Sequence, residues 1–216
     1  MQTKWSVALV ASFFMAICST GVGQALTITA GNHPEPNEEN MLLNSGLSGI
    51  TVTGTTNQTG GVFHLTGKET LTEPSNGQAR VEAVDGSFTY LAIDAEPGTT
   101  FQDIIFNPVL KGTGQQSGSL AIEVFLSDGS SVKSNALSLS QGNNFFTIVA
   151  GAGESIIGIT LTETGNNQLQ DVRQIRISGV CTDCVETPVP EPATLSLIGA
   201  AMVGLVGFTS RRGIRA

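Results

Sequence analysis

Between Met41 and Gly179 the apolar residues come in short runs, separated by glycine, asparagine, serine and threonine. Two stretches, Leu120–Leu126 and Val172–Ile177, alternate apolar and polar side chains, so each can turn one face inward. Dipeptides that favour tight turns, such as Asp128-Gly129, lie between these runs. No long window carries a helical period. The pattern therefore predicts an all-β chain.

The short runs recur at a spacing of about ten residues, which is typical of a β-sandwich. We expect one jelly-roll-like β-sandwich domain over residues 26–179. The polar stretch Gly31–Asn40 contains two prolines and is expected to be a loop. The expected strands are Ile50–Gly54, Val62–Thr66, Ala79–Val84, Phe88–Ile93, Thr100–Val109, Ser119–Leu126, Ala136–Leu139, Phe145–Val149, Ile156–Glu163 and Val172–Gly179.

The N-terminal residues 1–25 have the three parts of a secretory signal peptide. Lys4 supplies the positive start, Val7–Ile17 is apolar apart from Ser12, and Gly23-Gln24-Ala25 offers small residues at a cleavage site. The alternative is an uncleaved N-terminal anchor, but the apolar run is short for a span. We therefore expect export.

The C-terminal residues 189–216 also fall into three parts. Pro190-Glu191-Pro192 is followed by an uncharged run, residues 193–209, and by a basic end, residues 210–216, with Arg211, Arg212 and Arg215. The run is long enough for a minimal transmembrane helix. The arginines favour the cytoplasmic side, which places the remainder of the chain outside. The prolines favour an extended segment that a processing enzyme can bind.

This order of motif, apolar run and arginine cluster resembles the PEP-CTERM sorting signal of Gram-negative bacteria, a tail also catalogued as an ice-binding protein C-terminal domain. The resemblance implies that an exosortase recognises Pro190, Glu191 and Pro192 and removes the tail. It also implies a product exported alongside extracellular polysaccharide. The alternative is an ordinary C-terminal anchor behind a Pro-rich linker. A second tripeptide, Pro34-Glu35-Pro36, lacks the following span and is expected to be silent.

The charge of the chain is −8 and is distributed unevenly. All 18 acidic residues lie between Glu35 and Glu191, and that stretch contains only six basic residues, so its net charge is about −12. Such a surface repels nucleic acid and anionic membrane. It suits a polysaccharide bridged by cations, and solubility alone explains it equally well.

Residues 180–188 are expected to form a Pro-rich linker that contains Cys181 and Cys184. The C-x-x-C pair has three interpretations: half of a zinc site, a redox pair, or a disulfide formed within or between chains. There is no second pair to complete a zinc site, and redox-active pairs normally begin a helix. An oxidising exterior favours a disulfide.

Few residues suggest chemistry. His33 lies in the Pro-rich loop and His64 in an expected strand, and neither has a local signature of a catalytic triad. We expect no catalytic residue, no metal site and no cofactor. Acidic residues that could instead bind calcium on loops are Glu38, Glu39, Asp94, Glu96 and Asp103; a solvated acidic loop is the simpler interpretation.

The sequence thus predicts an exported, non-enzymatic protein of the cell surface or extracellular matrix. Its expected partners are the exosortase and secretion machinery, the inner membrane before processing, and extracellular polysaccharide, but not nucleic acid. One alternative is a module that binds polysaccharide or calcium; the only tryptophan, Trp5, lies in the leader, which weakens this alternative. Another is a secreted hydrolase, which would need two facing carboxyl groups about 5–9.5 Å apart.

Overall fold

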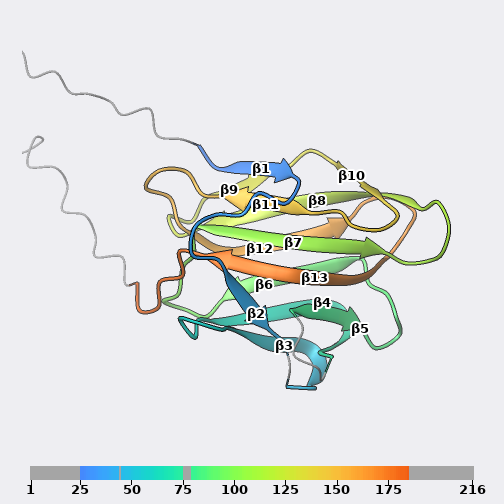
Figure 1. Ribbon diagram of the computed structural model, residues 1–216, viewed down its shortest axis with the longest axis horizontal. Helices are drawn as coiled ribbons and strands as arrows, with labels where there is room; N and C mark the ends of the chain where they lie inside the picture. The colour runs from blue at the N-terminus through green and yellow to red at the C-terminus, as the bar shows by residue number, and fades with distance from the viewer. Residues whose placement is uncertain (1–24, 44, 75–78, 185–216) are drawn as a thin grey trace, which may run out of the picture.

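The computed structural model describes residues 25–43, 45–74 and 79–184 (Figure 1). All the regular structure in this part of the chain is β-structure, which confirms the all-β prediction. The strands are β1 Thr27–Ala30, β2 Glu39–Leu42, β3 Ser48–Thr56, β4 Val62–Thr72, β5 Arg80–Ala83, β6 Tyr90–Ala95, β7 Asp103–Leu110, β8 Ser117–Leu126, β9 Ser131–Lys133, β10 Leu137–Ser140, β11 Phe146–Val149, β12 Ile156–Glu163 and β13 Leu169–Ser178.

The expected signal peptide, apart from Ala25, and the whole C-terminal sorting signal lie outside the described residues. Within the described ranges there is no helix of the length and apolarity that a membrane span requires.

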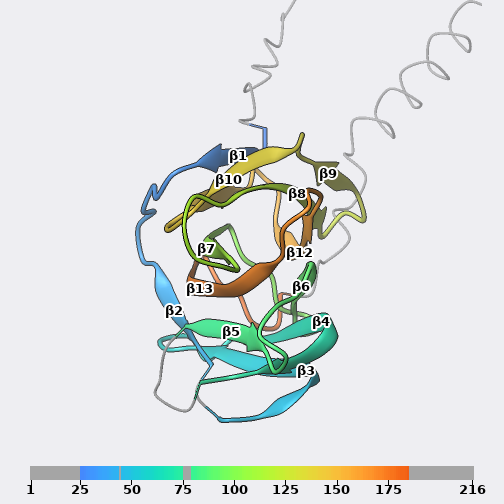
Figure 2. The same ribbon diagram turned by 90° about the vertical axis from the view of Figure 1, so that its right-hand side faces the viewer.

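The strands form one continuous antiparallel network in the order β1-β11-β7-β13-β2-β3-β4-β6-β12-β8-β10. Strand β9 pairs with β8, and β5 pairs with both β13 and β4. Seen along the long axis, β7 and β13 lie across a common interior from β12 and β6, with β3 and β4 below them (Figure 2). The network therefore curves around a single core.

The core consists of apolar side chains from both sides of this interior. Phe63 and Phe101 meet edge to face, with ring centroids 5.6 Å apart, which is a favoured aromatic geometry. Every residue of β7 is buried, and the strand is paired along both edges, with β11 and β13. The polar residues Asp103 and Asn107 alternate with the core residues Ile104 and Phe106, so they are buried on the face of β7 opposite the core.

Each of the ten expected strands overlaps an observed one, but β1, β2 and β9 were not predicted. All three are short, and β9 pairs only with β8. Strand β2 starts inside the expected loop, at Glu39. The backbone N–H groups of Gln58 and Thr59 bind its carboxylate at 2.9 and 2.7 Å, which allows an acidic residue to be buried in the sheet.

The domain also continues beyond Gly179, where the linker was expected to begin. Cys181 exchanges two backbone hydrogen bonds of 2.9 Å with Thr100, and the N–H of Cys184 donates to the carbonyl of Gly98 at 2.8 Å. The first five residues of the expected linker, 180–184, are therefore bound to the connection between β6 and β7.

Candidate functional site

A cleft of about 720 Å³ opens along one edge of β13. Strand β2 pairs with β13 at Arg176 and Ile177, whereas β5 pairs with it from Asp171 to Arg173. Between these pairings, the one backbone hydrogen bond that crosses the gap among the described residues is long, 3.5 Å from Ile175 N to Ala79 O. We call this opening the arginine cleft; its lining residues are Asn32, Asn40, Leu42, Ala79, Arg80, Asn143, Phe145, Arg173, Gln174 and Arg176.

A bulge in β13 forms the floor of the cleft. The register of β13 against β7 shifts between Arg173 and Arg176. Gln174, inside the bulge, has a φ of 54°, a left-handed conformation that is uncommon for any residue other than glycine. Bulges redirect side chains, and here Gln174 is exposed within the cleft. Strained backbone of this kind clusters at functional sites, which supports the cleft as a candidate site.

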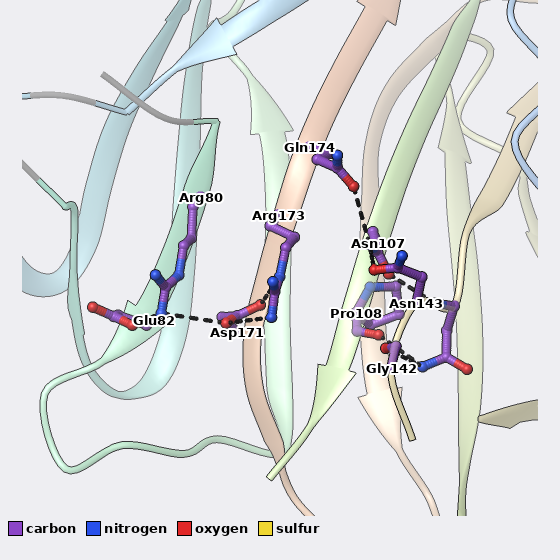
Figure 3. A network of polar contacts seen from close by, with 10 residues as sticks. Arg80, Glu82, Asn107, Pro108, Gly142, Asn143, Asp171, Arg173 and Gln174 are labelled. Carbon is purple, nitrogen blue, oxygen red and sulfur yellow. Dashed lines mark hydrogen bonds and ion pairs between the residues drawn. The ribbon is translucent and has the colours of Figure 1, made fainter. Parts of the chain in front are cut away.

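The buried carboxylate of Asp171 holds two of the three arginines. Arg173 donates to both of its oxygens, from Nε at 2.9 Å and from Nη2 at 3.2 Å, and Nη2 of Arg80 lies 3.3 Å from Oδ2 (Figure 3). Arg80 also forms an ion pair with Glu82. Asp171 is 0% exposed, so both guanidinium groups are fixed by a carboxylate that solvent does not reach.

Arg176, the third arginine, is held from the other side of the cleft. Its Nη1 lies 2.7 Å from Oε2 of Glu38, and its Nη2 donates to the side-chain oxygen of Asn32. Glu38 and Asn32 both belong to the loop that leads into β2. This ion pair therefore joins that loop to β13.

A network of amides positions the remaining polar groups. Asn107, fully buried in β7, donates to Oδ1 of Asn143 at 2.9 Å and to Oε1 of Gln174 at 3.1 Å (Figure 3). Its own Oδ1 accepts the backbone N–H of Asn144 at 2.7 Å. The turn before β11 is thus anchored to the central strand, and it brings Asn143 and the partly exposed Phe145 to the cleft.

The charged side chains that line the arginine cleft are all positive. All three arginines of residues 26–184 line the cleft, and none of the described residues that line it is acidic. The same segment contains 16 acidic residues and six basic ones, so the cleft differs in charge from the rest of the domain. The carboxylates that pair with the arginines lie behind them. The lining therefore offers guanidinium and amide groups beside one aromatic ring.

A second hollow, of about 400 Å³, lies at the end of β13; we call it the acidic pocket. It is lined by Glu35, Pro36, Asn37, Glu39, Thr59, Gln102, Asp103, Val149, Ser178, Gly179 and Val180. Asp103 is 2% exposed; Ser178 donates its hydroxyl to Oδ2, and Oδ1 has no partner among the described residues. Burial, and then the nearby carboxylates of Glu38 and Glu35, raise the pKa of Asp103 to about 7, although Arg176 opposes this shift.

A raised carboxyl pKa beside other carboxylates suggests a general acid, but the geometry of the acidic pocket does not support that role. The free oxygen of Asp103 is itself buried, so a substrate cannot reach it. Glu39 accepts hydrogen bonds from Gln58 and Thr59 at Oε2; burial opposes its ionisation, but these hydrogen bonds outweigh burial and lower its pKa. In the described part of the chain no three His, Cys, Asp or Glu side chains come together as a metal-binding group.

Neither His33 nor His64 lines the arginine cleft or the acidic pocket. His33 donates its backbone N–H to Thr147 at 3.0 Å and lines a shallow depression beside β1. His64 is exposed on β4; its Nε2 contacts Glu96 and its Nδ1 lies 3.5 Å from Oγ1 of Thr53. The Thr53–His64–Glu96 order imitates a nucleophile, base and acid, but 3.5 Å is too long for a good hydrogen bond and the group lies on an open surface.

The structure joins Cys181 and Cys184 in a disulfide, with their Cα atoms 5.8 Å apart. The disulfide is therefore intramolecular, and it lies where the last described residues form backbone hydrogen bonds with Gly98 and Thr100. Of the other residues predicted from the sequence, Pro190, Glu191, Pro192 and the three C-terminal arginines lie outside the described residues.

Sequence reasoning did not find the arginine cleft. In a regular strand, residues three apart point to opposite faces, so Arg173 and Arg176 gave no sign of sharing a site. Only the bulge between them brings both side chains to the same opening. A signal did exist, because Arg80, Arg173 and Arg176 are the only arginines between the two terminal segments.

Comparison with known proteins bears on the C-terminal segment. The family described as the PEP-CTERM protein-sorting motif matches residues 188–212. The chain carries a PEP-CTERM sorting signal. This signal marks a PEP-CTERM protein as one exported to the cell envelope or surface through an exosortase system.

The other comparisons concern the rest of the chain. No curated protein matches the chain. A solved structure of a mutant of CBM29-2, from a study of ligand recognition by family 29 carbohydrate-binding modules, aligns with 13% sequence identity and a TM-score of 0.23. The alignment covers 77% of this chain and 99% of that one.

Proposed function

We propose that this PEP-CTERM protein is a non-enzymatic component of the cell surface or extracellular matrix, and that its β-domain binds polysaccharide in the arginine cleft. An N-terminal leader starts export, the C-terminal span holds the chain with its arginines in the cytoplasm, and an exosortase then removes the tail. The observation that carries the binding proposal is the composition of the cleft lining.

That lining suits a polyhydroxylated ligand. Each amide of Asn32, Asn40, Asn143 and Gln174 can both donate and accept a hydrogen bond. Sugar hydroxyl groups have the same dual character, so they can pair with amides in either direction. Phe145 adds a partly exposed ring against which an apolar sugar face can pack. A few fixed polar groups beside an apolar surface are typical of small-ligand sites.

The carboxylates of the described residues favour binding over hydrolysis. Glycoside hydrolysis needs two carboxyl groups that face each other across the substrate. No carboxylate lines the arginine cleft, and in the acidic pocket the free oxygen of Asp103 is buried. These positions support a binding module and not a hydrolase.

The sorting half of the proposal is tested by intact-mass analysis of the protein from membranes and from culture supernatant. We expect the supernatant form to lack the residues beyond the Pro190-Glu191-Pro192 motif. Replacement of Glu191 with alanine should leave the full-length chain in the membrane fraction. A full-length C-terminus in the supernatant would contradict the proposal.

The binding half is tested by affinity electrophoresis through gels that contain the extracellular polysaccharide of the producing cells. We expect the secreted protein to be retarded. Asn40→Trp, which places a large ring in the cleft, should abolish the retardation. Thr51→Trp, at an exposed position on β3 outside the cleft, is the matched control and should migrate like the wild type. Equal retardation of all three proteins would exclude the cleft as the binding site.

A further inference from the structure

We infer that the arginine cleft selects acidic polysaccharides, whose sugar carboxylates are received by the guanidinium groups of Arg173 and Arg80. This inference rests on the proposed function, because it names the chemical class of the ligand that the same cleft binds. Three observations carry it: the distribution of charge over the domain, the way in which the arginines are held, and the donors that they keep free.

The distribution of charge directs an anionic chain to one place. Residues 26–184 have ten more acidic than basic side chains, so most of the surface repels an acidic polymer. The cleft is the exception, since it gathers every arginine of this segment and is lined by no carboxylate. A neutral polysaccharide would gain nothing from this segregation, whereas an acidic one would be guided by it.

The arginines are fixed before a ligand arrives. Asp171 accepts two hydrogen bonds from Arg173, at 2.9 and 3.2 Å, and forms a longer ion pair with Arg80, at 3.3 Å. Because Asp171 is fully buried, these ion pairs are shielded from solvent and hold both guanidinium planes in place. A ligand carboxylate therefore meets donors whose entropy is already reduced.

Both arginines keep donors for a ligand. A guanidinium has five N–H groups, and the contacts with Asp171 occupy only Nε and Nη2 of Arg173, whose side chain remains 38% exposed. Both ion pairs of Arg80, with Glu82 and Asp171, are made through Nη2. Its Nη1 therefore has no partner among the described residues and can donate to a ligand while Nη2 stays in place. The planar fork of a guanidinium matches a carboxylate in particular.

The test is calorimetric titration of the full secreted protein with a panel of acidic oligosaccharides: oligogalacturonate, oligomannuronate and a glucuronate-containing oligosaccharide. Each is paired with its carboxyl-reduced form, which keeps the sugar backbone and loses the charge. A sulfated galactan forms a separate arm, because sulfate is also an anion but lacks the planar carboxylate. The titrations are repeated at low and at physiological salt.

We expect at least one acidic oligosaccharide to bind at least about tenfold more tightly than its reduced form, as charge-assisted hydrogen bonds predict, and to weaken with salt. Removal of Arg173 alone would leave the buried carboxylate of Asp171 with only the 3.3 Å contact to Arg80, so the variant is the double replacement Arg173→Gln with Asp171→Asn. It should lose this preference. The matched control is Lys133→Gln, which removes one positive charge far from the cleft, at a side chain that is 70% exposed.

The outcomes separate the inference from the function beneath it. Equal affinity for the acidic and reduced forms overturns the acid selectivity and leaves the polysaccharide proposal standing. Equal loss in Lys133→Gln and in the double variant also overturns the inference, because a positive charge outside the cleft would then matter as much as Arg173 within it. Tighter binding of the sulfated galactan would assign the cleft to sulfate instead. Failure to bind any probe or the native polysaccharide removes both proposals.

Discussion

Two carboxylates buried along β13 and its neighbour β7 are treated in different ways. In the arginine cleft, Asp171 is fully buried and is paired with Arg173 and Arg80. In the acidic pocket, Asp103 is almost as deeply buried, but it receives only the hydroxyl of Ser178, and one oxygen has no partner in the described part of the chain. The comparison shows that burial alone does not determine the role of a carboxylate. Its hydrogen-bond and ion-pair partners decide whether the ionised form is stabilised.

The difference also decides what each hollow can bind. Asp171 stays behind its arginines, so that the cleft presents donors to a ligand. Asp103 has no cation of comparable proximity, and its pKa is raised to about 7 by burial and by neighbouring glutamates. Asp171 therefore positions ligand-binding groups, whereas the ionised form of Asp103 destabilises the fold.

The largest expected effect comes from Asp171→Ala. This change leaves two arginines without their buried counter-charge, so we expect a loss of about 3–5 kcal/mol in the free energy of unfolding. Urea denaturation measures it. The control is Glu123→Ala, which breaks the exposed 3.3 Å pair with Lys133 and should cost less than about 1 kcal/mol. Similar losses in both variants would show that Asp171 is not the anchor of the cleft.

The next effect concerns Asp103→Asn and depends on pH. Because the folded pKa of about 7 exceeds the ordinary value of 3.8, the native state holds this proton more tightly than the unfolded state. The contribution of Asp103 to stability should therefore be greatest below the ordinary pKa of 3.8 and should fall as the pH rises toward 7. The asparagine variant lacks this loss, so we expect it to be more stable than the wild type by roughly 2 kcal/mol at pH 8.

The same comparison should vanish only well below the ordinary pKa of 3.8, where Asp103 is protonated in both states. Unfolding curves at about pH 3, 5 and 8 measure the trend. Asp128→Asn provides the control, since hydrogen bonds from Ser130 lower the pKa of that exposed residue and no gain at pH 8 is expected. A wild-type stability that rises between pH 4 and 7 relative to Asp103→Asn would contradict the account of the acidic pocket.

The smallest expected effect comes from removing the disulfide that follows β13. The disulfide between Cys181 and Cys184 closes a short loop beside the acidic pocket, so replacing both residues with serine should cost about 1–2 kcal/mol. Polysaccharide binding in the cleft should not change. Thermal unfolding with and without a reductant measures the loss, because the reductant should destabilise only the wild type. A lower polysaccharide affinity of the double-serine variant would contradict this independence of the disulfide and the cleft.

The sequence predicted the fold class because strand formation leaves a local trace. Short apolar runs and turn dipeptides such as Asp128-Gly129 marked ten of the strands. The C-terminal signal was predicted for a similar reason, since its motif, apolar run and arginines are adjacent in the chain. Strand β2 was missed because its burial of Glu39 depends on Gln58 and Thr59, which lie far along the chain.

The candidate site could not be predicted for the same physical reason. Arg80 and Asp171 are distant in sequence and meet only because β5 pairs with β13. Arg173 and Arg176 share the cleft only because a bulge changes the direction of the strand between them. Long-range pairing and local irregularity leave no periodic pattern for sequence analysis to detect.

The central claim is that the arginine cleft is the ligand-binding surface of this exported domain. Hydrogen-exchange mass spectrometry of the secreted protein, with and without the polysaccharide that retards it, tests this claim most directly. The account predicts slower exchange in peptides that span the bulge of β13 around Gln174 and the turn around Asn143, and no change on β3. Protection on β3 and β4 with none at the bulge would contradict it.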